Sequence, residues 1–451
     1  MKRITAVFLA LLLSCIAYVS AAPAAESDFT AGAVVRLRYE SWQNIVDLGT
    51  ITQKDRNFFR FRFNVWGNLK LNPDNDIYLR LTSEPKYQLG PYRGETGKKV
   101  EEDEIIVDNL NFQSKNVFGL PVDVKIGRQD FIGPTGYGDY FLILDGTPAD
   151  GSRTFYFNAA KARVHLGQNN WMDVIYITDP AYDIYAPSIY AANKRQLNIS
   201  NEQGFVAYGH GKISDNLIVE PYYMYKTEKG FKGLKDIPDL DINAIGARVV
   251  VSLGTWKIRG QYAHEWGTYD NGGPWNKRRA NGGYIFVDRQ YSDIALKPGF
   301  SIGYVYLSGD NPDSKSTNEA WDPLFSRAPE WNELMIYTYV YETLNYGGAL
   351  PGYWTNLNLY EAKFNMTFDP ATKLVVSYQY LTAPEHTDSP FTTMFSNNGK
   401  VRGHLPTMIL THAFSKKVSG MAQLEYFVPE SFYADHADNG TFLRLQLMFK
   451  I

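Results

Sequence analysis

The sequence predicts an all-β fold in which residues 25–451 form one transmembrane antiparallel β-barrel of about 18 strands. Three observations predict it: strand patterns with a period of two residues, compact turn signals at a regular spacing, and no apolar run long enough for a mature membrane helix. Aromatic residues make up 15% of the 451 residues. This content suits a membrane barrel, because only alternate residues of each strand need to be apolar.

The first 24 residues are predicted to be an export signal that is cleaved. Lys2 and Arg3 precede a short apolar stretch at 4–13, and an Ala-Pro-Ala cleavage site follows at 22–24. The only cysteine, Cys15, leaves with this segment, which excludes a disulfide scaffold and a Cys-ligated zinc site. The rest of the chain keeps 43 basic residues (45 minus 2) and 48 acidic ones. A net charge of −5 argues against a basic nucleic-acid binder.

The strand signal is a strict alternation of apolar and polar residues. At 59–66, three phenylalanines and a valine alternate with residues that include Arg60 and Arg62. The same alternation recurs at 35–40, 256–262, 361–368 and 443–450. Many such strands with charges on the polar face, and no helical pattern between them, favour a barrel over a β-sandwich.

Turn signals set the strand count. Compact clusters of Gly, Pro, Asn, Asp or Ser lie at 72–75, 118–121, 168–170, 214–216, 254–255, 297–299, 369–371 and 415–417. Eight short turns join nine hairpins, which gives about 18 strands with the turns at the periplasmic end. We expect long extracellular loops near 44–56, 86–103, 131–150, 180–198, 229–240, 269–280, 310–351, 384–401 and 429–439.

The excess of tyrosine predicts aromatic girdles at the two membrane interfaces. The residues expected there are Tyr222, Tyr223, Tyr225, Tyr304, Tyr306, Tyr378 and Tyr380. The other interpretation, a core of stacked aromatics in a soluble sandwich, fits poorly with the many charges on the opposite strand faces.

Basic residues on the polar strand faces are the candidate pore lining. They are Arg36, Arg38, Arg60, Arg62, Arg80, Lys161, Arg163, Arg248, Lys257, Arg259, Lys363 and Arg444. Such a cluster would attract anionic solutes, because local charge decides permeation and arginine binds carboxylate and phosphate with two parallel hydrogen bonds. An equally physical interpretation is that these groups pair with acids and stiffen the wall. The acids available are Glu40, Glu84, Asp123, Asp173, Glu361 and Glu425.

Two segments are candidates to fold inward and narrow the lumen. The glycine-rich segment at 133–140 is not a phosphate loop, because no Gly-Lys-Ser/Thr and no helix pattern follow it. The segment at 310–351 contains an apolar patch at 334–337 that would be unfavourable in water. Hydrolytic and metal motifs are missing from the sequence, and its seven histidines are scattered, so we expect no enzymatic activity, metal or cofactor.

Two stretches resemble the alginate-export family of outer-membrane channels. The first has Lys-Ile-Gly-Arg-Gln at 125–129, Tyr-Gly-Asp at 137–139, Arg-Thr-Phe at 153–155 and Lys-Ala-Arg at 161–163. The second has Trp-Asp-Pro-Leu-Phe at 321–325, Asn-Leu-Asn at 356–358 and Asp-Pro at 369–370. The resemblance implies an 18-stranded monomer whose best-known members pass anionic polyuronate along arginines. It adds Arg128 and Arg153 to the candidate pore lining, beside Arg163.

The function predicted is a Gram-negative outer-membrane porin for passive diffusion of small hydrophilic, anionic solutes. Expected contacts are outer-membrane lipid, a small or polymeric solute and, during biogenesis, the barrel-assembly machinery, with no nucleic acid. The alternatives are an exporter of an anionic polysaccharide and the barrel component of a porin-cytochrome electron conduit. An outer-membrane hydrolase and a secreted β-sandwich lectin are the rivals outside transport.

Overall fold

The structure is a computed structural model that describes most of the chain after the predicted signal. The described residues are 28–51, 55–90, 99–101, 105–131, 137, 139, 141–142, 156–186, 198, 200–229, 239–270, 276–326, 331–342, 353–389 and 391–451. The predicted signal at 1–24 lies outside them. Among the described residues, no helix is both long enough and apolar enough to cross a membrane.

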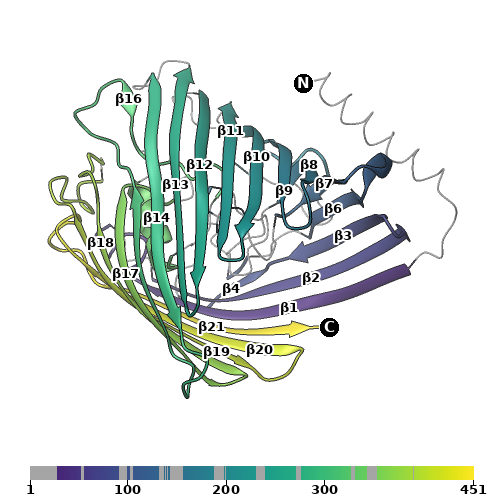
Figure 1. The fold of residues 1–451 in the computed structure, drawn as a ribbon. Helices are drawn as coiled ribbons and strands as arrows, with labels where there is room; N and C mark the ends of the chain where they lie inside the picture. Colours follow the sequence, from purple (N-terminus) through teal and green to yellow (C-terminus); the bar gives the residue numbers. More distant parts are fainter. Residues whose placement is uncertain are drawn as a thin grey trace.

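Eighteen antiparallel strands form a closed barrel (Figure 1). They are β1 (Asp28–Gln43), β2 (Arg56–Asn72), β3 (Asn75–Ser83), β6 (Ile106–Ser114), β7 (Val122–Gln129), β8 (Phe157–His165), β9 (Trp171–Asp179), β10 (Asn201–Ser214), β11 (Leu217–Lys229), β12 (Asp239–Leu253), β13 (Trp256–Asp270), β14 (Lys277–Gln290), β15 (Gly299–Leu307), β17 (Leu357–Asp369), β18 (Thr372–Thr382), β19 (Val401–Ala413), β20 (Val418–Pro429) and β21 (Gly440–Lys450). The yellow β21 lies beside the purple β1, and their pairing from Val34 with Lys450 to Gln43 with Thr441 closes the wall.

The remaining elements are short and lie in the connections. They are β4 (Lys86–Gln88), β5 (Val100–Glu101), β16 (Thr317–Asn318), the 3-10 turn η1 (Val117–Gly119) and the helix α2 (Leu334–Glu342). All eight predicted turns fall between consecutive wall strands, and the strand ends that flank the nine predicted long loops lie at the other end of the barrel. The predicted count of 18 strands is therefore confirmed.

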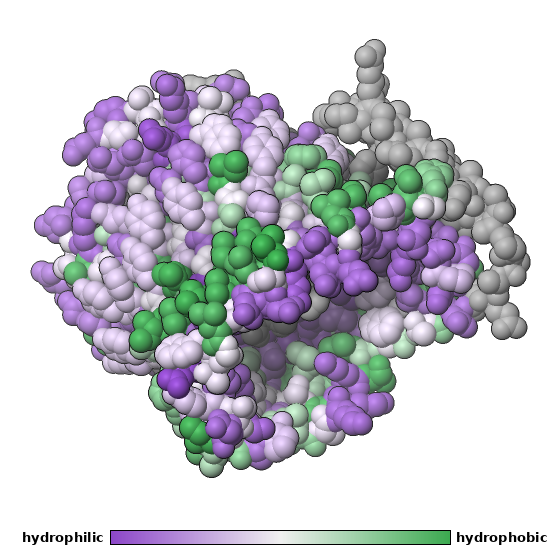
Figure 2. All heavy atoms as spheres, viewed as in Figure 1, coloured by the Kyte–Doolittle hydropathy of each residue, from purple (hydrophilic) through white to green (hydrophobic). Residues whose placement is uncertain are grey.

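The alternation predicted at 59–66 separates the two faces of the wall. Phe63 and Val65 are 43% and 57% exposed, whereas Arg60 and Arg62 are 2% and 4% exposed. Since successive side chains of a strand point to opposite faces, the apolar set lies outside and the arginines lie inside. Figure 2 shows hydrophilic side chains (purple) gathered at the loop end near β14 and β16, with hydrophobic ones (green) lower on the wall.

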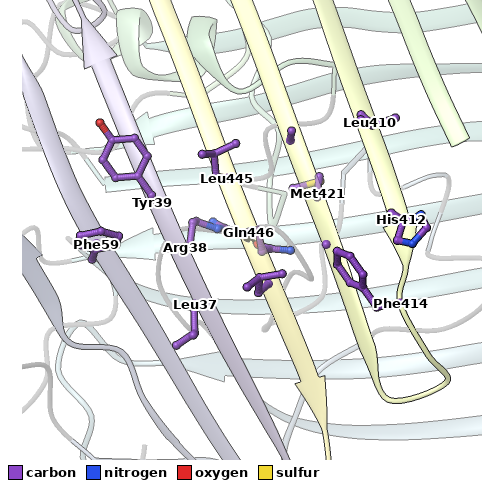
Figure 3. Close-up of a pocket in the computed structure, with 13 residues that line it drawn as sticks. Leu37, Arg38, Tyr39, Phe59, Leu410, His412, Phe414, Met421, Leu445 and Gln446 are labelled. Carbon is purple, nitrogen blue, oxygen red and sulfur yellow. Dashed lines mark hydrogen bonds between the residues drawn. The ribbon is translucent and has the colours of Figure 1, made fainter. Parts of the chain in front are cut away.

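A groove of about 520 Å³ on the outer wall shows the same division of faces (Figure 3). It crosses β19, β20, β21, β1 and β2, and apolar side chains such as Leu37, Leu410 and Leu445 line it. Arg38 and Gln446 contribute to its floor, and the Arg38 Nε donates to Gln446 Oε1 at 2.9 Å. The polar ends of this pair belong to the inner face.

Six of the seven tyrosines predicted for the girdles face outward as that prediction requires, and one does not. Tyr223, Tyr225, Tyr304, Tyr306, Tyr378 and Tyr380 occupy outward positions of their strands. Tyr222 faces inward, is 4% exposed, and stacks on Tyr208 with ring centroids 5.7 Å apart. Three tyrosines within four residues cannot share one face of a strand, because neighbouring positions alternate.

The loop end of the barrel is filled from inside by two connections. Aromatic and aliphatic residues of the β7–β8 and β15–β17 loops join the main buried cluster with residues of the inner wall. They include Phe131, Tyr137, Phe141, Leu142, Trp321, Phe325, Leu334, Met335 and Tyr339. The described parts of both segments that were predicted to fold inward do so.

Candidate functional site: a charged lumen narrowed by two loops

Five arginines of β1, β2 and β21 form one cluster on the inner wall, here called the arginine ladder. Its members are Arg36, Arg38, Arg60, Arg62 and Arg444, all buried. In the register of β1 with β2, Arg36 stands directly opposite Arg62, and Arg38 directly opposite Arg60. Like charges in directly opposed positions destabilise a sheet, so this arrangement depends on acids placed among the guanidinium groups.

Within the described residues, three carboxylates are seen in contact with the ladder arginines. Glu84 contacts Arg36 at 3.3 Å, Arg60 at 4.0 Å and the Nε of Arg62. Glu40 accepts from Arg444 at 2.9 Å and from Arg38 at 3.3 Å, and Glu333 of the β15–β17 loop accepts from Arg444 at 2.7 Å. These contacts join five cations to three anions, a formal charge of +2 for the eight groups.

Two further arginines on β3 and β8 are held by acids of neighbouring strands. Arg80 contacts Asp108 at 2.8 Å and Asp130 at 2.7 Å. Arg163 binds both oxygens of Asp173, at 2.7 and 2.8 Å, and its guanidinium lies 3.9 Å from the Trp171 ring centroid. The Tyr137 hydroxyl of the β7–β8 loop also donates to Asp173, so this pair fixes the loop to the wall.

Arg248 on β12 and Arg259 on β13 hold a carboxylate that comes from the β7–β8 loop. Arg248 donates to both oxygens of Asp139, at 2.8 and 3.0 Å, and Arg259 donates at 3.4 Å. The Tyr284 hydroxyl donates to the same carboxylate at 2.7 Å. Burial acts to raise the pKa of Asp139, but Arg248, Tyr284 and Arg259 outweigh it and hold that pKa below its ordinary value. The carboxylate is therefore ionised.

The same two arginines also have acid partners on the wall. Glu220 accepts from Arg248 at 2.8 Å, and Asp288 accepts from Arg259 at 3.2 Å. Asp139 is thus the third carboxylate of this group and the only one of the three that comes from a loop.

The three lysines predicted to line the lumen lie in surroundings that differ from those of the arginines. Lys363 on β17 pairs with Glu361 at 2.9 Å. Lys257 is exposed beside the turn at 254–255. Lys161 on β8 is half-buried and stands directly opposite Lys125 on β7.

Of the two arginines that the family resemblance added, Arg128 does not join these groups. Arg128 stands opposite Leu110, whose side chain is 48% exposed, at the loop end of β7. Its guanidinium contacts Asp183 at 2.7 Å and lies 4.0 Å from the Tyr156 ring centroid, so it holds the chain around 156 and 183. Arg153 lies outside the described residues.

Of the six acids expected to neutralise the lumen, Glu40, Glu84 and Asp173 contact arginines as described, and Glu361 contacts Lys363. Asp123 pairs with His165 at 2.9 Å. Glu425 instead accepts from two backbone N–H groups: that of Glu333, shared between its two oxygens at 3.0 and 3.1 Å, and that of Leu334 at 2.7 Å. These groups lie at the N-terminus of α2, where a carboxylate satisfies unpaired donors and complements the helix dipole.

The C-terminus of α2 is held by a buried ion pair. Glu342 accepts from two nitrogens of Arg402 on β19, at 2.5 and 2.7 Å. Between the two ends, the Tyr337 ring packs on Trp42 of β1 with centroids 4.0 Å apart. The helix is therefore fastened to β1, β19 and β20, and it occupies part of the lumen.

The two inward loops touch each other. The backbone N–H of Phe325 donates to the carbonyl of Leu142 at 2.9 Å, and the rings of Phe141 and Trp321 are 5.0 Å apart. Lys226 of β11 donates to the carbonyl of Leu324 at 2.7 Å. Side chains of both loops and of the inner wall thus meet inside the barrel.

Several residues of this site were missed by sequence reasoning. Lys125 lies in a clear alternation of valine, aspartate, valine and lysine at 122–125, which could have shown its inward position. Glu333, Glu342 and Arg402 gave no sequence signal, because their partners are 60 or more residues away. Within the part of the chain that the structure describes, no group of three His, Cys, Asp or Glu residues is arranged to hold a metal.

Comparisons with known proteins identify the fold and the family. The model of the alginate export family matches residues 28–382. No curated protein sequence matches the chain. The structure is similar to Acinetobacter baumannii OccAB4, with 12% identity, coverage of 95% of this chain and 98% of that chain, and a TM-score of 0.56.

Two Pseudomonas aeruginosa channels with bound solutes are also similar in fold. OccK2 (OpdF) in complex with glucuronate has 10% identity, covers 94% of this chain and 98% of its own, and gives a TM-score of 0.53. OpdK with vanillate has 11% identity, 93% and 98% coverage, and a TM-score of 0.55. At such identity the likeness concerns the fold, whereas the family match covers more than half of the chain. The protein is an outer-membrane β-barrel channel that belongs to the alginate export family.

Proposed function

We propose that this protein is a passive channel for small anionic solutes in the outer membrane of a Gram-negative cell. It reaches that membrane by means of the signal predicted at 1–24, which is removed, and it acts as a monomer without a cofactor. Solutes diffuse along the charged inner wall and pass the constriction formed by the two inward loops. No bond of the solute is made or broken.

The arginine ladder is the observation that carries this proposal. Arginines that stand directly opposite one another concentrate positive charge on one side of the lumen. A narrow lumen with low-dielectric walls strengthens such a local potential, so the net charge of the whole chain matters less. Asp139 supports the same conclusion, because two arginines and a tyrosine hydroxyl already hold a carboxylate inside the barrel.

Glucuronate and vanillate, the solutes in the two similar channels, are both small carboxylates. We extend this solute class to the present chain on the basis of the arginines and not of sequence identity. Arginine recognises carboxylate through two parallel hydrogen bonds, as Arg163 and Arg248 do with their aspartates.

A second candidate function is export of an anionic polysaccharide, and the family match favours it. A polymer must occupy the whole passage, so it requires the two loops to leave the lumen. The contacts of Asp139, Glu333 and Glu342 with the wall oppose that movement. We therefore place export second to diffusion of small solutes.

The test is the single-channel conductance of the detergent-purified protein in a planar bilayer. The reversal potential is measured in a salt gradient, first alone and then with glucuronate or with polyuronate added. A steady conductance with anion preference, reduced by glucuronate, supports the proposal. Preference for cations would overturn the anionic solute class, and block by the polymer at far lower concentration than by glucuronate would favour export.

Two matched double variants test whether the arginine ladder sets the ion selectivity. Arg60→Gln combined with Arg62→Gln removes two cations from the inner wall. Lys416→Gln combined with Lys417→Gln removes two cations from an exposed turn and is the control. Anion preference should fall in the first double variant and stay unchanged in the second. An equal change in both would mean that the total charge, and not the ladder, sets the selectivity.

A further inference from the structure

Two lysines face each other on the inner wall of β7 and β8. Lys125 stands directly opposite Lys161 in the register of these strands. In the next inward positions toward the turn end, Asp123 stands opposite Arg163, which binds the inward Asp173. Because side chains of one strand face share an alternate set of positions, both lysines point into the lumen with Arg163. We call Lys125 and Lys161 the lysine pair.

The lysine pair differs from the other inward cations in its partners. The ladder arginines and Arg80, Arg163, Arg248, Arg259 and Lys363 each contact a carboxylate. In the described structure, neither Lys125 nor Lys161 has an ion pair within 4.0 Å or a side-chain hydrogen bond. Directly opposed residues have Cβ atoms about 5 Å apart, and like charges there destabilise the sheet.

The acids nearest to the lysine pair are engaged elsewhere. Asp173 binds Arg163, Asp130 binds Arg80, and Asp123 pairs with His165. Asp76 lies in the same row, but Gln113 stands between it and Lys125. The two half-buried lysines thus stand directly opposite each other without a direct ion pair, and a mobile anion could bind both of them.

The neighbouring inward positions toward the loop end carry a glycine and an alanine, and Ala159 is buried in the main cluster. Toward the loop end, the residues next to the two lysines on the same strand face are Gly127 and Ala159, which also stand opposite each other. Gly127 has φ +121°, and a Cβ there would lie 2.3 Å from the carbonyl oxygen of Leu110. Only glycine fits there, and the side-chain amide of Gln129 donates to the carbonyls of Lys125, Gly127 and Ala159 at 3.3, 3.3 and 3.0 Å. Gln113, directly across from Lys125, supplies an amide that can donate.

We propose that Lys125 and Lys161 form a binding site inside the channel for a small divalent oxyanion, of which inorganic phosphate is the simplest. This inference rests on the proposed function, because it names a solute group for the same lumen. Two ammonium groups match two negative charges, and lysine binds phosphate as a compact point charge with three donors. A single carboxylate would neutralise one lysine and leave the other without a counter-charge.

Binding can be tested without conduction. The thermal unfolding midpoint of the detergent-purified protein is measured at one scan rate against rising inorganic phosphate, with chloride adjusted to constant ionic strength. The wild-type midpoint should rise and saturate, because a ligand that binds the folded state stabilises it. Lys125→Gln or Lys161→Gln should weaken apparent phosphate affinity roughly tenfold, and the double variant should lose the effect.

Two controls keep this test decisive. Lys416→Gln combined with Lys417→Gln removes the same charge from an exposed turn and should keep the wild-type response. Lys161→Arg keeps the charge and should retain phosphate binding even if the glutamine variants fold poorly. Phosphate that stabilises the wild type and the Lys125→Gln/Lys161→Gln double variant equally would overturn the proposal.

Conductance then separates this site from the channel function. A wild-type channel that conducts anions but shows no stabilisation by phosphate would refute the site and leave the proposed function intact. Phosphate stabilisation that depends on the lysine pair, in a protein that does not conduct, would support the site and refute the function. If both hold, phosphate should reduce chloride current in the wild type at concentrations that leave the double variant unaffected.

Discussion

Asp139 and Arg248 are 109 residues apart in the chain, yet the guanidinium of Arg248 donates to both carboxylate oxygens of Asp139, at 2.8 and 3.0 Å. Asp139 has φ +53°, in the left-handed region that few residues other than glycine adopt without strain. The contact with Arg248 therefore holds both the β7–β8 loop and an unfavourable backbone conformation. It also places a negative charge inside the barrel.

Asp139→Asn should make the channel more selective for anions. The amide keeps an oxygen for Arg248 and Tyr284 but removes one negative charge from the lumen. One unit charge across ~10 Å of a water-like medium contributes about 0.4 kcal/mol, with opposite sign for an anion and a cation, so the anion-to-cation permeability ratio should rise about fourfold. The measurement is the reversal potential in a salt gradient. Asp293→Asn, in the exposed turn between β14 and β15, is the control, and an equal shift in that variant would contradict the prediction.

Local alternation was enough to predict the wall, and it was not enough to predict the contacts across the lumen. The faces of Arg60 and Arg62 follow from residues on either side of them, so a pattern of eight residues determines them. Glu333 and Arg444 meet only because a 49-residue connection, from 308 to 356, folds back into the barrel. The alternation of residues within a strand gives no sign that a distant connection folds back into the barrel.

The residues at 106–114 do not alternate strictly between the two faces of the wall, and the register gives the reason. The register of β3 with β6 shifts between Arg80 and Leu81, so an extra residue on β6 interrupts the strict alternation. As a result Asp108 and Asn109 are both buried although they are consecutive. The prediction for Tyr222 was wrong for the opposite reason. Its strand alternates strictly, but the prediction rested on tyrosine content and placed all three neighbouring tyrosines on the lipid face.

Arg402→Met should destabilise the loop that contains α2. Arg402 is completely buried and makes two hydrogen bonds to Glu342, at 2.5 and 2.7 Å. Removing one partner of a buried ion pair leaves an uncompensated charge and costs about 3–5 kcal/mol. We expect this loss in the free energy of unfolding in urea. The double variant Arg402→Met/Glu342→Leu removes both charges and should be more stable than the single variant, and an equal or larger loss would contradict this account.

Glu425→Ala should loosen the start of α2. The carboxylate accepts from the N–H groups of Glu333 and Leu334, the latter at 2.7 Å, and these donors have no partner inside the helix. Loss of an acceptor for buried donors costs about 1–3 kcal/mol. Hydrogen exchange of these two amides should therefore be faster by one to two orders of magnitude. Glu430→Ala, exposed at the loop end of β20, is the control and should leave their exchange unchanged.

Ionisation of Asp310 should lower the stability of the folded protein as the pH rises, and the variant Asp310→Asn should remove this effect. The residue lies in the β15–β17 loop, and its Oδ1 accepts from the Glu319 N–H at 2.8 Å. Burial raises the pKa of Asp310 from 3.8 to about 6, and this hydrogen bond and Arg278 only partly offset the rise. The folded state thus binds the proton more tightly than the unfolded state. The loss of folding stability caused by the ionised Asp310 carboxylate is absent below about pH 4. It grows as the pH rises to about 6 and is constant above that.

The measurable quantity is the difference in unfolding temperature between Asp310→Asn and the wild type across pH 4 to 8. The difference should be small at pH 4 and favour the variant increasingly up to about pH 6, because asparagine keeps the acceptor and carries no charge to bury. Other titrating groups affect both proteins equally and cancel. Asp313→Asn, exposed in the same loop, should give a difference that does not change with pH. If the difference in unfolding temperature instead became smaller as the pH rose, the buried Asp310 carboxyl would not be the cause of the pH dependence.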